Sequence, residues 1–153
     1  MINKDIKFMK EALREAYKAY EIGEVPIGAV IVYQDKIIAR GHNMREKLNS
    51  SLAHAEIVAI KKASKKLNSW RLEDCTLYVT VEPCIMCSGA IIQSRIPRVR
   101  YGALDPRFGM HKSMINIFDY KFNHEVDIVG GILDMEASNL MKQFFKEIRI
   151  KNN

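Results

Sequence analysis

Two short motifs supply residue types that can bind a metal ion and transfer protons. His54 and Glu56 are separated by one residue, and Cys84 and Cys87 form a C-x-x-C pattern further along the chain. One imidazole and two thiolates suit Zn²⁺ and leave a fourth position for water, as in catalytic zinc sites. A carboxylate two residues from a ligand can act in general acid–base catalysis. The spacing therefore predicts a hydrolytic zinc centre.

Each motif also has a simpler interpretation when it is taken alone. A C-x-x-C that follows a strand fits a thioredoxin-like redox pair or two buried thiols equally well. In isolation, His54 fits a surface histidine near a helix N-cap, and Glu56 fits a first-turn acid that the helix dipole favours. It is the combination of the two motifs that favours the metal site.

The elements that must position these motifs alternate between strand and helix patterns. An amphipathic helix is expected over 5–22, a hairpin over 28–33 and 36–40, and helical segments over 53–67, 84–94 and 135–150. Further strands are expected over 75–81, 98–102 and 125–133, after an irregular stretch over 103–123. A strand, helix and strand at this separation form a right-handed crossover between parallel strands. We therefore expect an α/β fold with three α/β/α layers and a mixed five-stranded sheet.

Composition narrows the class of protein. The 153 residues are 48% hydrophobic and 27% charged, which excludes intrinsic disorder and predicts one domain over 1–153. The longest uncharged run, Pro83–Ser94, is too short to cross a bilayer, and no export signal is recognised, so we expect a cytoplasmic protein without membrane contact. The net charge of +6 suits a polyanionic partner, although a basic balance is also common without one. Three cysteines argue against a disulfide framework.

The two motifs together form the H-x-E and P-C-x-x-C signature of zinc-dependent nucleobase deaminases. The longer strings over 53–57 and 80–96 resemble those of the bacterial tRNA-specific adenosine deaminases, which convert adenosine to inosine at the wobble position of the anticodon. The similarity extends to 24–30, to 41–43 and to the Phe144-Phe145 pair near the end of the chain. It therefore runs through the whole sequence.

The resemblance implies a cytidine deaminase-like fold and a role for particular residues. His54, Cys84 and Cys87 would hold one Zn²⁺ per chain, and Glu56 would be catalytic as the proton shuttle. Substrate contacts are implied for the base-binding Asn43, for the backbone around Ala55, and for Phe145 and Arg149 in the last helix. The implied partners are a tRNA anticodon stem-loop and a second copy of the chain, because the relatives are homodimers.

Several residues keep an alternative assignment. Asn43 also fits a turn residue, and Phe144 and Phe145 are either both buried or divided between the core and base stacking. His111 is expected to face solvent from a loop, and the default role of Trp70 is packing. Two other functions compete with tRNA deamination: deamination of a free nucleobase, nucleoside or nucleotide (guanine, cytosine, dCMP), and a non-catalytic, zinc-stabilised RNA-binding module.

Overall fold

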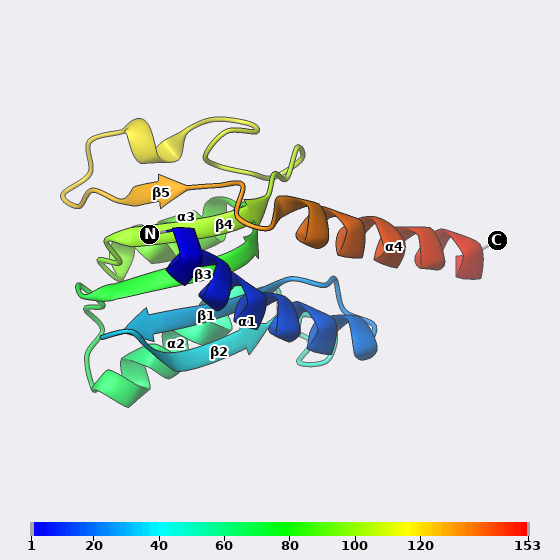
Figure 1. Cartoon of the computed structure of the whole chain (residues 1–153), viewed down its shortest axis with the longest axis horizontal. Helices are drawn as coiled ribbons and strands as arrows, with labels where there is room; N and C mark the ends of the chain where they lie inside the picture. Colours follow the sequence, from blue (N-terminus) through cyan, green and yellow to red (C-terminus); the bar gives the residue numbers. More distant parts are fainter. Residues whose placement is uncertain (1, 153) are drawn as a thin grey trace.

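The computed structural model describes residues 2–152, so both ends of the predicted 1–153 domain lie outside it. Figure 1 shows the arrangement of the elements. In chain order they are α1 (Ile2–Glu21), β1 (Gly28–Tyr33), β2 (Lys36–His42), α2 (Ala55–Leu67), β3 (Cys75–Val81), α3 (Ile85–Gln93), β4 (Arg98–Ala103), the 3-10 helix η1 (Ile117–Asp119), β5 (Asp127–Val129) and α4 (Asp134–Asn152).

The five strands form one mixed sheet in the order β2-β1-β3-β4-β5. β1 pairs antiparallel with both β2 and β3, whereas β3, β4 and β5 run parallel to one another. The β1–β2 hairpin turns at Gln34 and Asp35, whose φ angles of 51° and 62° are those of a type I′ turn. The predicted mixed sheet and the parallel β3-α3-β4 crossover are therefore confirmed.

Helices cover both faces of the sheet, which confirms the predicted three layers. In Figure 1, α1 and α4 lie in front of the sheet, and α2 and α3 lie behind it. Successive residues of β1 point to opposite faces. Ala29 and Ile31 belong to the core that contains Ala59 and Ile60 of α2, while Val30 belongs to a second core together with residues of α1.

The last strand is shorter than the 125–133 segment that we predicted. β5 covers only Asp127–Val129, paired with the first half of β4. At Gly130 a Cβ atom would lie 2.2 Å from the Tyr101 ring, and Gly131 has a φ of 90°. The regular ladder therefore ends where the chain passes over this ring and turns toward α4.

Three aromatic side chains settle alternatives that the sequence left open. Phe144 is buried and packs edge-on against Tyr20, while its neighbour Phe145 is 40% exposed. This division follows from the 100° between adjacent helical residues. Packing was the default role given to Trp70; its side chain is largely exposed and lies outside the core, with the guanidinium groups of Arg71 and Arg95 beside its ring.

A buried carboxylate connects α1 to the end of β2. Glu15 is 3% exposed, and its oxygens lie 2.7 Å from Lys18 Nζ and 3.1 Å from His42 Nδ1. Burial raises the pKa of Glu15, but the hydrogen bonds with Lys18 and His42 and their positive charge outweigh it, so the pKa lies below its usual value. The ionised carboxylate is therefore the form that stabilises this contact.

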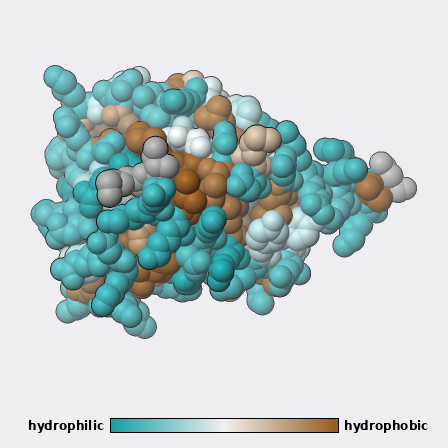
Figure 2. Space-filling model, in the orientation of Figure 1, coloured by the Kyte–Doolittle hydropathy of each residue, from teal (hydrophilic) through white to brown (hydrophobic). Residues whose placement is uncertain are grey.

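The surface is mainly hydrophilic on the face that carries α1 and α4. Figure 2 shows hydrophobic residues on this face mostly between α1 and the start of α4, and a mostly hydrophilic surface over the projecting part of α4, with a hydrophobic group near its end. Within residues 2–152, no helix has both the length and the apolar character that a membrane span requires.

Candidate metal centre and active site

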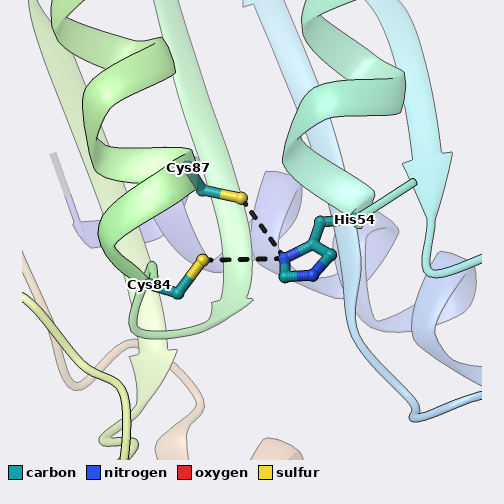
Figure 3. A group of neighbouring side chains, drawn as sticks. All are labelled: His54, Cys84 and Cys87. Carbon is teal, nitrogen blue, oxygen red and sulfur yellow. Dashed lines mark hydrogen bonds between the residues drawn. The ribbon is translucent and has the colours of Figure 1, made fainter. Parts of the chain in front are cut away.

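The candidate metal ligands lie at the beginnings of two helices behind the sheet. His54 immediately precedes α2, and Cys84 immediately precedes α3, each with an extended backbone. Cys87 lies in the first turn of α3, three residues after Cys84, and therefore on the same side of the helix. Since α2 and α3 both begin at the same end of the sheet, the two motifs meet although they are far apart in sequence (Figure 3).

The distances within this group fit a tetrahedral zinc ion. The Nδ1 atom of His54 lies 3.6 Å from the Sγ atoms of Cys84 and Cys87, and the three atoms lie within 4.8 Å of one another. Zinc bonds of ~2.0 Å to nitrogen and ~2.3 Å to sulfur at tetrahedral angles separate the two atom types by about 3.5 Å. The donor set and its spacing are therefore compatible with a metal ion such as zinc held by three protein ligands.

One of the candidate ligands carries the charge that metal binding needs. The pKa of the Cys84 thiol is lowered to about 4, mainly by its hydrogen bond with Cys87 and to a smaller extent by its hydrogen bond with His54. The His54 pKa is raised above its usual value, chiefly by its hydrogen bond with Cys84. At neutral pH, Cys84 is therefore a thiolate, the form in which cysteine binds metals.

Glu56 lies in the first turn of α2, with its side chain inside the protein. It is 4% exposed, and burial, with the neighbouring charge of Cys84, raises its pKa to about 7. A carboxyl group with a pKa near the operating pH can both accept and donate a proton. The fold therefore places a carboxyl group that can exchange protons two residues from His54, in the group that could bind a metal.

Asn43 follows directly after β2. A backbone hydrogen bond between the residues next to Asn43 and His54 brings these two parts of the chain together. The amide of Met44 donates to the carbonyl of Ala53, 2.9 Å away, and so joins the two ends of the 44–53 loop. Asn43 is 7% exposed, and its Oδ1 atom is buried without a hydrogen-bond partner among the described residues. An unpaired buried acceptor costs about 1–3 kcal/mol, so this oxygen is available for a donor on a ligand.

The other predicted contact residues lie in different environments. Ala55 is fully buried, so neither its side chain nor its own main chain is exposed to a substrate. Phe145 and the exposed Arg149 lie on α4, on the opposite face of the sheet from α2 and α3. The structure therefore brings His54, Glu56, Cys84, Cys87 and Asn43 into one region but does not bring Phe145 and Arg149 into the metal-ligand group.

Two buried acids near the site were not recognised from the sequence. Glu24 accepts hydrogen bonds from the backbone amides of Glu46 and Lys47 in the 44–53 loop. Glu82, at the end of β3, accepts several from the loop that follows β4. For Glu82 the available signal was an acid beside Pro83 at the end of an apolar strand, which does not reveal its partners.

His111 lies in the loop after β4, and the expectation that it faces solvent is wrong. Its ring is half-buried, with Nδ1 2.8 Å from the hydroxyl of the buried Tyr101, and burial lowers its pKa. It does not belong to the candidate metal-ligand group. Its ring helps to attach the loop to β4.

Comparison with known proteins defines the class. A family model described as MafB19-like deaminase matches residues 2–149. A solved structure from a study of A-to-I editing by tRNA:A34 deaminases at the wobble position has a TM-score of 0.85, with 43% identity over 88% of this chain and 98% of that one. The guanine deaminase structure from Bacillus subtilis has a TM-score of 0.63, with 34% identity over 76% of this chain and 85% of that one. The fold is therefore that of a deaminase, which confirms the predicted cytidine deaminase-like fold and the prediction of an enzyme.

Similar curated proteins indicate the particular family of deaminases. The tRNA-specific adenosine deaminase of Bacillus subtilis is 48% identical over 151 residues, covering 98% of this chain and 94% of that protein. The chain belongs to the family of tRNA-specific adenosine deaminases, as the resemblance of its motifs predicted.

Proposed function

We propose that this protein hydrolyses adenosine to inosine and ammonia at the wobble position of a tRNA anticodon. The observation that carries the proposal is the juxtaposition of His54, Cys84 and Cys87 with the buried Glu56, in a chain that is 48% identical to a tRNA-specific adenosine deaminase. The fold similarity to tRNA:A34 deaminases supports the same substrate.

The cofactor would be one Zn²⁺ per chain, held by His54, Cys84 and Cys87. One imidazole and two thiolates suit this borderline-soft ion, and the 3.6 Å separations fit its bond lengths. Bound zinc supplies a Lewis acid that makes water a strong nucleophile at neutral pH. The remaining steps depend on groups of the protein itself.

Glu56 would move the protons of the reaction. Hydrolysis forms a C–O bond at C6 of adenine and breaks the C–N bond to the amino group, so the base must be protonated at N1 and the leaving nitrogen must gain a proton. The buried carboxyl group, with a pKa of about 7, can take a proton from water and return it to these nitrogens. Its burial excludes bulk water from this exchange.

Adenine recognition would use Asn43 and the backbone around Ala55. The unpaired Oδ1 of Asn43 can accept a hydrogen bond from the ligand. A flipped-out base in a single-stranded loop would reach these groups at a lower unstacking cost than a base in a duplex.

The remainder of the anticodon stem-loop would contact the basic and aromatic surface. Phe145 is exposed enough to stack on a base, and Arg149 is available to a phosphate. The net charge of +6 supports binding to RNA. Such contacts would contribute binding energy that a free nucleoside lacks.

We also propose that the protein acts in the cytoplasm as a homodimer. Leu48, Leu52 and Ile85 belong to the segments that carry the metal ligands, and more than half of each side chain is exposed. Exposed apolar side chains of this size are typical of protein interfaces. Light scattering would give twice the chain mass if this is correct.

The decisive experiment compares substrates for the zinc-loaded protein. An anticodon stem-loop with adenosine at its first anticodon position should yield inosine, measured by nuclease digestion and mass spectrometry. Free adenosine, cytidine and guanine should react poorly, and the same stem-loop with its adenosine moved by one position should also react poorly. Faster turnover of guanine or a nucleoside would support the small-molecule alternative and reject the tRNA substrate.

A further inference from the structure

The side chain of Glu82 organises a loop beside the candidate active site. It is 3% exposed, and its carboxylate accepts hydrogen bonds from the amides of Asp105 at 3.0 Å, His111 at 2.9 Å, Lys112 at 2.7 Å and Ser113 at 3.1 Å. The hydroxyl of Ser113 donates a further one. One buried carboxylate therefore holds both ends of the 105–113 loop.

The loop also packs tightly against the segment that leads to the metal ligands. At Gly109 a Cβ atom would lie 2.2 Å from the carboxyl carbon of Glu82, so no side chain can be accommodated there. The buried Met110 donates its amide to the carbonyl of Pro83, 3.1 Å away, and Pro83 immediately precedes Cys84. The position of the loop is thus tied to the position of a candidate zinc ligand.

The outer surface of the same loop has the chemistry of an RNA-binding surface. Arg107, Phe108 and Lys112 are exposed, and the Arg107 guanidinium carbon lies 5.7 Å from the centre of the Phe108 ring. Aromatic rings that stack on bases, together with cationic groups that contact phosphates, are typical of single-stranded RNA binding. The loop therefore presents basic and aromatic groups outward while its amides point to Glu82.

We propose that Glu82 is a positioning residue for RNA: it holds the 105–113 loop beside the active site so that Arg107, Phe108 and Lys112 contact the nucleotides around the reacting base. This inference rests on the proposed tRNA substrate and deepens it. Glu82 acts through the loop and does not touch the reacting atoms. Its loss should therefore weaken productive RNA binding while the zinc content is retained.

The test measures kcat and KM of zinc-loaded variants on the anticodon stem-loop. Glu82→Gln keeps the shape of the side chain but places an amide donor against backbone donors, and KM should rise about 10-fold or more with a smaller change in kcat. Gly109→Ala, which pushes the loop away from an intact Glu82, should have the same effect. Asp5→Asn removes a partly buried carboxylate on α1, on the opposite face of the sheet from α2 and α3, and should leave KM unchanged.

A double-mutant cycle distinguishes positioning from a purely structural role. In a variant that already carries Arg107→Ala, Phe108→Ala and Lys112→Ala, adding Glu82→Gln should raise KM no further. If the two effects multiply instead, or if Glu82→Gln and Gly109→Ala leave KM unchanged while the wild type forms inosine, the inference is overturned. If Glu82→Gln does not fold, Gly109→Ala and the milder Ser113→Ala decide the question. Absence of inosine with the wild type would refute the proposed function first, and this inference with it.

Discussion

Adding a single methyl group at position 41 should lower the catalytic rate strongly while it lowers the folding stability only modestly. Gly41 lies near the end of β2 and packs against the first turn of α2, which begins at Ala55. A Cβ atom there would lie 2.5 Å from the carbonyl oxygen of Ala55 and 2.9 Å from the amide nitrogen of Ala59. An ordinary contact of at least 3.4 Å requires the first turn of α2 to move away by about 1 Å, because close-packed interiors have no free space.

This displacement should act mainly on catalysis, because the first turn of α2 follows His54 and contains Glu56. A misplacement of about 1 Å at a catalytic group can cost about 10²-fold in rate. Overpacking of a core typically costs about 1–3 kcal/mol of folding stability. We therefore expect Gly41→Ala to lower kcat by about 10²-fold and to reduce the free energy of unfolding by about 1–3 kcal/mol.

The assay combines inosine formation on the stem-loop, zinc content and urea unfolding. Gly89→Ala is the matched control, because nothing lies within 4 Å of a Cβ atom at Gly89 of α3. It should keep its zinc and gain about 0.5–1 kcal/mol of stability, the usual benefit of alanine over glycine within a helix. Wild-type activity and stability in Gly41→Ala would refute the packing of α2 on β2 that we describe.

Four further groups of residues lead to separate predictions. Glu56→Ala should lose at least ~10²-fold in turnover and keep zinc and RNA binding, measured by elemental analysis and titration. Replacing Cys84 and Cys87 together by alanine should remove bound zinc, so an unchanged zinc content would contradict the proposed ligands. Because the pKa of Glu15 lies below its usual value, its contribution to stability is present above the unfolded-state pKa and is lost as the pH falls through the folded-state pKa. Glu15→Gln should therefore cost about 1–3 kcal/mol near neutral pH, and the difference from wild type should narrow in acid, as followed by urea unfolding. Arg149→Ala should weaken RNA binding. It should also reduce the slope of log affinity against log salt concentration by at most about 0.7, the value for one phosphate contact on a single strand.

Most of the secondary structure was predictable because it depends on patterns within short segments. The β3-α3-β4 crossover was identified from its succession of elements, and the hairpin at Gln34 and Asp35 from its strand patterns. The order β2-β1-β3-β4-β5 and the antiparallel pairing of β1 with β3 were not predicted. Pairing between distant strands depends on how the whole chain folds, and no local pattern specifies it. The early end of β5 was not predicted for the same reason, since it depends on a contact with the distant Tyr101 ring.

The candidate site also has features that the sequence predicts and features that only the folded chain creates. His54, Glu56, Cys84 and Cys87 were singled out from residue types and spacing, because metal binding and proton transfer each require particular side chains. Their 3.6 Å separations, the burial of Glu56 and the unpaired oxygen of Asn43 are tertiary features. Glu82 is the clearest case, since its hydrogen-bond donors lie 23 to 31 residues later in the chain. Local sequence specifies which groups are present, whereas their burial, and so their pKa values and partners, depends on contacts between segments that only the folded chain brings together.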